Sequence, residues 1–278
     1  MRTTTGIRGL PVPPVADLGH RRGERPLPAA VQRAIGAMHE RYHEPMTLAG
    51  LSAEVFVSPF HFSRIFAKAT GVPPGRYLTA VRLFEAKRLL LTSKLTVADI
   101  VCTVGYSSAG TFTRRFSRAV GMAPSQYREP RVRDLLLAVA PHFQQLPSPE
   151  ALRDAGRSRL PSPQGTASIT VRVDLPGDRP PGDLFVGVFA ESIPQRGPVA
   201  FTGLPGTRSA TVTLDGVPPG RWLVLAAAAH PTGSGGSVLS FAAQRRPVTV
   251  TGSGSYPASV RARELQPTDP PIAITLAA

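Results

Sequence analysis

The sequence has little cysteine and no long apolar run. Cys102 is the single cysteine among 278 residues, so no disulfide can form within one chain. Because Cys102 follows Ile100 and Val101 in a helical pattern, we expect a buried thiol rather than a redox sensor. No stretch approaches the roughly 20 apolar residues of a membrane span, and the start of the chain lacks the apolar segment of a secretory signal. We therefore expect a cytoplasmic protein with no membrane partner.

Motifs for catalysis and metal binding are also missing. The six histidines show no metal-ligand spacing, and the pair four residues apart, His39 and His43, fits a solvated helix face. There is no Gly-x-Ser-x-Gly nucleophile motif, and the segment that begins at Gly233 lacks the lysine of a phosphate-binding loop. We expect no catalytic residue, no metal and no cofactor, and therefore no enzyme.

Acidic residues are scarce in the first half of the chain. The net charge is +14, and residues 1–130 hold 18 Lys and Arg against 8 Asp and Glu. Such concentrated positive charge is typical of a surface that faces a polyphosphate. The alternative is a solvated, arginine-rich surface, because 29 of the 32 cations are arginine.

A repeat lies within this basic segment. Six residues recur 50 positions apart, as Phe62, Arg64, Phe66, Gly71, Pro74 and Tyr77 and then as Phe112, Arg114, Phe116, Gly121, Pro124 and Tyr127. Each copy reads as a helix, a tight turn and a second helix. This arrangement is typical of the helix-turn-helix motif, and two copies predict two base-reading helices on one chain.

The spacing between the copies predicts how the two units are placed. Apolar residues from Val31 to Tyr42 predict a first helix, and Thr47, Ser58 and Thr96 are expected to begin later ones. A connecting helix from Pro74 to Leu91 would span about 27 Å. The reading helices at 58–69 and 108–119 are then expected about one DNA turn, or about 34 Å, apart. They would enter successive major grooves.

Long ordered matches identify a resemblance. They include Ser-Pro-Phe-His-Phe-Ser-Arg-Ile-Phe at 58–66, Thr-Gly-Val-Pro-Pro-Gly-Arg-Tyr-Leu at 70–78 and Phe-Thr-Arg-Arg-Phe-Ser-Arg-Ala-Val-Gly-Met-Ala-Pro-Ser-Gln-Tyr-Arg at 112–128. Residues of about 30–129 resemble the homeodomain-like DNA-binding domain of the AraC/XylS family of bacterial transcription regulators. The resemblance implies a bipartite reader of double-stranded DNA that acts as an activator or a repressor.

Two departures from the family pattern matter. The family usually carries this domain at the carboxyl end, after a cupin-like or other sensor domain, whereas here it comes nearly first. The first turn also has Phe56 and Val57 where a glycine is usual, so we expect that turn to be less tight than the second.

Helical periodicity separates inner and outer faces in each reading helix. Phe62, Ile65 and Phe66 form the inner face of the first helix. The side chains expected to reach base edges are Phe60, Ser63, Arg64, Ala109, Gly110, Thr111 and Arg114. Those expected to contact DNA phosphates are Lys68, Arg76, Thr113, Arg115, Arg118 and Arg128.

Arg64 is the best single candidate for base reading, because a guanidinium can bind guanine O6 and N7 together. A phosphate contact or an intramolecular ion pair is its alternative. Ala109 and Gly110 have little reach, so we expect sequence reading mainly from the first helix. Arg82 on the connecting helix is expected to pair with a helix-end carbonyl or a carboxylate instead.

After Gly165 the pattern changes to short strands. Ile169, Val171 and Val173 alternate with polar residues. Further strands are expected at 184–189, 209–214, 222–228, 238–242, 248–251, 259–262 and 272–276. Such a series predicts an antiparallel β-sandwich. The segment 214–225 weakly resembles transthyretin-like and carboxypeptidase-regulatory modules. Trp222 with Phe185, Phe189 and Phe241 is expected to form an aromatic core, with a pocket as the alternative.

The expected fold class is therefore an all-α tandem helix-turn-helix domain followed by an antiparallel β-sandwich. The divisions are a flexible arm at 1–27, the DNA-binding domain at 28–130, a helix at 131–146 and a Pro-rich linker within 131–164, and the β domain at 165–278.

The leading hypothesis is a sequence-specific transcription regulator, with double-stranded DNA and RNA polymerase as partners. A small-molecule effector and a homodimer remain open, with the β domain as sensor, dimer interface or partner surface. One alternative is a DNA-tethered protein that docks onto another protein. Another is a repair-type fusion, whose alkyl transfer would need Cys102.

Overall fold

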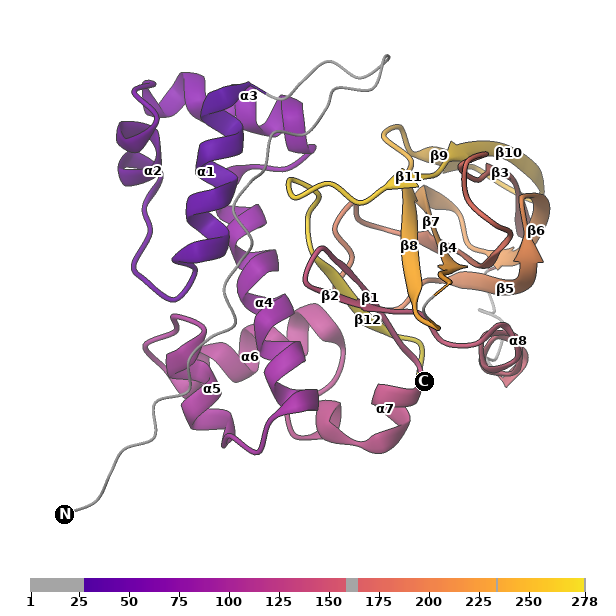
Figure 1. The fold of residues 1–278 in the computed structure, drawn as a ribbon, viewed down its shortest axis with the longest axis horizontal. Coiled ribbons are helices and arrows are strands. Elements are labelled where there is room, and N and C mark those ends of the chain that lie inside the picture. The colour runs from indigo at the N-terminus through magenta and orange to yellow at the C-terminus, as the bar shows by residue number, and fades with distance from the viewer. Residues whose placement is uncertain (1–27, 159–164, 234, 278) are drawn as a thin grey trace.

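The computed structural model describes residues 28–158, 165–233 and 235–277. The arm expected at 1–27 lies outside these residues. A helical region is followed by a β-rich region with mostly antiparallel sheets, and the two lie against each other (Figure 1). In the described residues, no helix is both long and apolar enough to cross a membrane.

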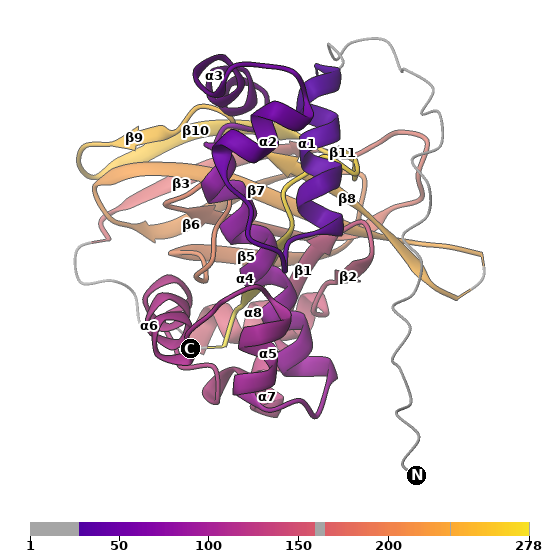
Figure 2. The ribbon, with the colours of Figure 1, turned by 90° about the vertical axis from the view of Figure 1, so that its left-hand side faces the viewer.

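The helical region contains two helix-turn-helix units joined by a long helix. α2 and α3 form the first unit, α5 and α6 form the second, and α4 runs between them (Figure 2). The helices are α1 (Ala29–Glu40), α2 (Leu48–Glu54), α3 (Pro59–Thr70), α4 (Pro74–Thr92), α5 (Val97–Thr103), α6 (Ala109–Val120) and the short 3₁₀ helix η1 (Gln126–Arg128). The helices predicted at 58–69, 74–91 and 108–119 are confirmed to within two residues.

Local sequence explains where these helices begin and end. The Thr47 side chain accepts a hydrogen bond from Gly50 N at 3.0 Å, and Thr96 forms a reciprocal capping box with Asp99. Ser58 makes no side-chain cap bond, although Pro59 supplies a first-turn residue that needs no N–H partner. Gly71 and Gly121 end the reading helices at φ values of 80° and 92°, a left-handed conformation that glycine adopts without a Cβ clash.

The expected looser first turn is wrong. Phe56 adopts φ 56°, close to the 78° of Gly105 at the same place in the second unit. Hydrogen bonds match as well, since Val57 N donates to Ser52 O and Tyr106 N donates to Val101 O, both at 3.0 Å. The turn geometry is the same in both units, and Phe56 bears the backbone strain that a glycine would avoid.

The β region contains three main sheets. Their orders are β12-β1-β2, β10-β3-β6 and β11-β8-β7-β4-β5, with β9 paired to β7. Strands β1 (Leu136–Ala140) and β2 (Phe143–Gln145) come before the linker. The strands that follow the linker are β3 (Ala167–Asp174), β4 (Gly182–Phe189), β5 (Ala200–Thr207), β6 (Ser209–Val217), β7 (Gly220–Pro231), β8 (Ser237–Ala243), β9 (Val248–Val250), β10 (Gly254–Arg261), β11 (Arg263–Glu264) and β12 (Ile272–Thr275).

Two features of these sheets differ from the sequence prediction. β10 runs parallel to β3, whereas all strands were expected to be antiparallel. Strand β5 was not predicted, because Gly203, Pro205 and Gly206 interrupt its apolar pattern. One apolar core joins the sheets, with Val171 from β3, Val186 from β4 and Ala226 from β7.

The helix expected over 131–146 is wrong. Only α7 (Pro130–Asp134) is helical, and it is followed by β1 (Leu136–Ala140) and β2 (Phe143–Gln145). All five residues of β1 are buried, and β1 pairs antiparallel with β12, so that Leu137 faces Ile274. A short apolar run fits either a buried helix or a buried strand. Here the segment forms a strand because it pairs with β12, far along the chain. The linker holds α8 (Pro149–Ser158), which packs on β5.

One core joins the helical and β regions. Tyr77 and Leu78 of α4 belong to one buried apolar cluster with residues of the β region. These are Leu137 of β1, Ile274 of β12 and Ile193 of the segment between β4 and β5. The boundary between the DNA-binding domain and the β domain is therefore visible in the sequence pattern, whereas the buried apolar core continues across it.

Candidate nucleic-acid interface

The first predicted reading helix, α3, has one buried face and one solvent-exposed face. Phe62 and Phe66 are fully buried, and the Phe66 ring meets Tyr77 edge to face at 5.5 Å between centroids. On the other face Phe60 is 80% exposed, and Arg64 and Lys68 are also exposed, while Ser63 is half-buried. The structure thus places all four expected DNA-facing residues of this helix at the surface.

The second reading helix, α6, repeats this arrangement. Phe112 and Phe116 are fully buried, and the Phe116 ring meets Tyr127 edge to face at 5.6 Å. The residues expected to face DNA are all exposed: Ala109, Gly110, Thr111, Thr113, Arg114, Arg115 and Arg118. Three arginines against no acidic residue in α6 make this face strongly positive.

Two of the expected phosphate contacts have partners within the chain. The Arg128 guanidinium donates to Ser93 O at 3.4 Å and to Leu95 O, so it fastens the end of the second unit to the loop after α4. Arg76 forms an ion pair with Glu191 of the β region, with 2.6 Å between Nη2 and Oε2. These interactions compete with a DNA phosphate for both side chains.

Arg82 has the structural role predicted for it. Its guanidinium donates to Tyr42 O at 2.7 Å and to Glu44 O at 2.8 Å, and lies 5.8 Å from the centre of the Tyr106 ring. The carbonyls follow the end of α1, so Arg82 ties that helix end to α4.

Two side chains lie where the sequence did not place them. Cys102 is exposed on α5, and the expectation of a buried thiol is wrong, because only Ile100 and Val101 face the core. His39 is half-buried beside Tyr77, with 3.3 Å between Nε2 and the hydroxyl, so the solvated face expected for it is wrong. Burial and, to a lesser extent, the nearby His142 together lower the pKa of His39 to about 4, against a smaller opposing effect of Glu85. His43 is exposed as expected.

Phe56 is a surface feature that the sequence reading missed. It is 92% exposed in the turn before α3 and combines left-handed backbone with unburied apolar area. Both properties cost free energy in the isolated protein. The phenylalanine at the position where the family usually has a glycine is the sequence signal for this exposed ring.

The aromatic residues of the β region form core rather than a pocket. Phe185, Phe189 and Phe241 are buried in the cluster shared with the helical region. Trp222 packs against the other core, and its indole N–H donates to Pro218 O at 2.8 Å. The aromatic core expected from the sequence is confirmed for the three phenylalanines, whereas Trp222 is half-buried and packs against a different cluster.

Known proteins match this chain over its helical part. A family model described as a helix-turn-helix domain matches residues 51–130. A helix-turn-helix-type transcriptional regulator of Mycobacterium tuberculosis is 39% identical over 79 residues, which are 28% of this chain and 30% of that protein. The lactose operon transcription activator of Staphylococcus xylosus is 28% identical over 98 residues, 35% of each chain. Residues 51–130 form an AraC-type helix-turn-helix domain.

Two solved structures are each similar to 36% of this chain. A probable AraC family transcriptional regulator from Rhodopseudomonas palustris is 26% identical, covering 36% of this chain and 94% of that one, with a TM-score of 0.33. The DNA-binding domain of the global transcriptional factor AdpA, solved with a target DNA, is 29% identical over 36% and 89%, with a TM-score of 0.35. This chain spans about a third of the length of its first curated relatives, from 30% to 39%.

Proposed function

We propose that this protein is a sequence-specific transcription regulator that reads two successive major grooves with α3 and α6. The chain carries an AraC-type DNA-binding domain, and its relatives are transcriptional regulators. The observation that carries the finer proposal is the repeated construction of α3 and α6. Each buries two phenylalanines on one face and leaves the other face open and basic.

The length of α4 supports reading two grooves. Its 19 residues extend about 28 Å at 1.5 Å per residue. With the width of the flanking units, the centres of the two reading helices approach the roughly 34 Å of one DNA turn. In this proposal, Arg64 binds a guanine edge and Phe60 packs on a thymine methyl. Arg114 and the small residues Ala109, Gly110 and Thr111 follow the shape of the second groove.

The surrounding cations position the reader on the DNA backbone. Lys68, Thr113, Arg115 and Arg118 are exposed beside the reading faces and supply phosphate contacts. Arg76 and Arg128 do so only by exchanging their intramolecular partners. We propose that the protein works in the cytoplasm without enzymatic activity of its own. RNA polymerase, an effector bound by the β region and a second copy of the chain are its proposed further partners.

Selection from a random duplex pool with the full chain at near-physiological salt tests this function. We expect enrichment of two short blocks whose centres lie about one helical turn, or 10–10.5 base pairs, apart. Enrichment of one block alone, or salt-sensitive binding without any enriched sequence, would contradict reading of two grooves.

A further inference from the structure

One loop of the β region touches the helical domain at three places. This segment, residues 190–199 between β4 and β5, is the bridging loop. Its Glu191 pairs with Arg76 at the start of α4, next to the first unit. Its Gln195 accepts hydrogen bonds from Lys87 in the middle of α4, at 2.9 Å through Oε1 and 3.2 Å through the backbone oxygen.

The same loop also reaches the second unit. Arg196 Nη2 donates to Arg118 O at 2.6 Å, at the carboxyl end of α6. The Arg196 side chain lies over Gly121, where an added Cβ would come within 3.6 Å of its Nε. Ile193, between these contacts, is buried in the core that includes Tyr77. The bridging loop therefore connects the start of α4, its middle and the end of α6.

Lys87 is the central point of this attachment. It is fully buried, and Nζ donates to the two oxygens of Gln195 and, at 2.6 Å, to Ala273 O of β12. Three oxygen acceptors match the three protons of an ammonium group, whereas a neutral amine has only two protons to donate. All three oxygens come from the β region. Separating α4 from that region would take every hydrogen-bond partner from a buried lysine.

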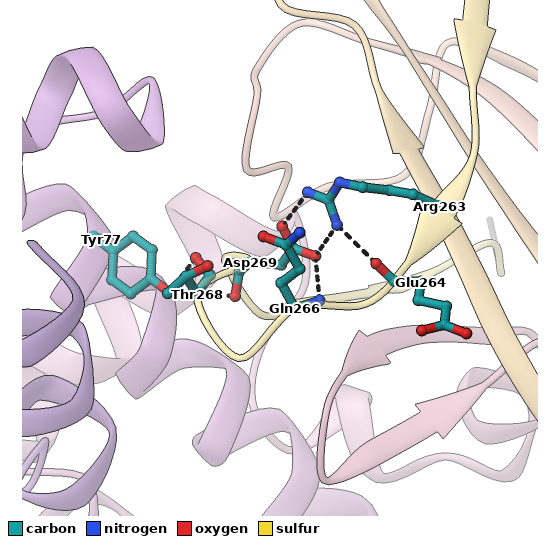
Figure 3. Close-up of polar contacts among 6 residues, drawn as sticks. All are labelled: Tyr77, Arg263, Glu264, Gln266, Thr268 and Asp269. Atoms are coloured by element: carbon teal, nitrogen blue, oxygen red, sulfur yellow. Dashed lines mark hydrogen bonds and ion pairs between the residues drawn. The ribbon is translucent and has the colours of Figure 1, made fainter. Parts of the chain in front are cut away.

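A second attachment lies nearer the amino end of α4. The Tyr77 hydroxyl donates to Asp269 O at 3.2 Å and to Thr268 O at 3.3 Å (Figure 3). The Asp269 carboxylate accepts from both terminal nitrogens of Arg263, at 2.7 and 2.8 Å, and from Gln266 N at 2.8 Å. The acceptors for Tyr77 are thus held in place by a network of their own.

We infer that the bridging loop sets which spacing between DNA half-sites the protein accepts, with Gln195 and Arg196 as positioning residues. This rests on the proposed reading of two grooves. Each base pair added between half-sites turns the second one by about 35° and moves it by about 3.4 Å. Joined through α4 alone, the α5–α6 unit can follow such a change by pivoting in the loop after α4. Fixed to the β region at Arg118, Lys87 and Arg76, the two units keep one relative placement.

The experiment compares spacings with the full chain. Half-sites selected by the unaltered protein are placed at the selected spacing and at one base pair more or less, and each Kd is measured. We expect the unaltered protein to bind the altered spacings at least about tenfold more weakly, a difference of about 1.4 kcal/mol. In the double variant Gln195→Ala/Arg196→Ala this ratio should fall to about threefold or less.

Two further variants make the comparison decisive. Arg221→Ala removes the same charge from an exposed position of β7, where it faces Thr249 of β9, and should leave the ratio unchanged. Lys87→Met keeps a long unbranched side chain in the buried slot but removes three hydrogen bonds, and should also flatten the spacing profile. Circular dichroism and thermal unfolding identify which variants are folded. If Lys87→Met does not fold, the loop variant decides.

Each outcome has one meaning. If the unaltered chain enriches no paired blocks, the proposed function fails, and this inference fails with it. If paired blocks are enriched but the folded loop variant keeps the tenfold ratio, only the inference is overturned. It is also overturned if the unaltered profile is already flat, or if the loop variant weakens all three spacings equally, since Arg196 would then serve as a phosphate contact.

Discussion

Two equivalent tyrosines offer a matched test of how the helical and β regions are held together. Tyr77 and Tyr127 occupy the same position of the repeat, are both fully buried, and both meet a phenylalanine ring edge to face. Their hydroxyls differ. Tyr77 donates to the carbonyls of Thr268 and Asp269, whereas the Tyr127 hydroxyl is buried with no hydrogen-bond partner among the described residues.

Removing each hydroxyl should therefore have different consequences. Tyr77→Phe loses a hydrogen bond with a net worth of about 0.5–1.5 kcal/mol and leaves buried carbonyls without a donor, so we expect it to lower the free energy of unfolding by about 1–2 kcal/mol. Tyr127→Phe removes a buried polar group that gains nothing from the fold, and should be neutral or stabilising by up to about 1 kcal/mol.

Urea unfolding of the full chain at 25 °C, followed by circular dichroism, measures both changes. A shared slope against urea concentration would show that the folded and unfolded states are otherwise comparable. The reasoning is refuted if the two variants lose equal stability, or if Tyr127→Phe is the more damaging, because the ring contacts would then outweigh the hydroxyl contacts to the β region.

Three other predictions concern the helical region. Arg64→Ala should lower the binding free energy by about 1–3 kcal/mol at one base position and relax the base preference there, whereas Arg118→Ala should weaken binding to all sequences alike. Affinities for single-base variants of the selected site measure both effects. Uniform weakening by Arg64→Ala would contradict its base-reading role. His39 has a pKa of about 4 when folded against 6.5 in its ordinary state, so its neutral form contributes stability above pH 6.5 that is lost as the pH falls toward 4. Unfolding measured across this range should therefore show a weaker pH dependence in His39→Gln than in the unaltered protein, and identical slopes would count against it. Phe56→Gly removes the strain of a left-handed backbone at a residue with a Cβ, and should raise the free energy of unfolding by about 0.5–1 kcal/mol. A loss of stability would mean that the Phe56 ring makes packing contacts that its 92% exposure does not indicate.

The helical units were predictable because their signals are local. Caps at Thr47 and Thr96, glycines at the ends of the reading helices and apolar residues at helical spacing each act within a few positions. The outer faces of α3 and α6 follow directly from that spacing. The partners of Arg76 and Arg128 could not be predicted in this way, because each depends on where another segment packs.

The errors in the prediction share a physical cause. Leu136–Ala140 is apolar throughout, and only its pairing with β12 makes it a strand. Cys102 and His39 were placed by helical position alone, but their exposure depends on which neighbours cover each side of α5 and α1. Lys87 carries no sequence signal for burial, since its acceptors lie 108 and 186 positions away.

The pairing of β1 with β12 also bears on the order in which the molecule can form. Leu136 of β1 pairs with Thr275 of β12. The strand β1 can therefore pair with β12 only after the rest of the β region has been synthesised. The last acceptor of Lys87, Ala273 O, arrives on that same strand. Contacts between such distant segments form slowly, because a long loop must close before they gain any free energy. The two helix-turn-helix units can complete their local helices early in synthesis. Until β12 arrives, however, the side of α4 that carries Lys87 and Tyr77 lacks part of its cover, a partly apolar surface open to chaperones in the newly made chain.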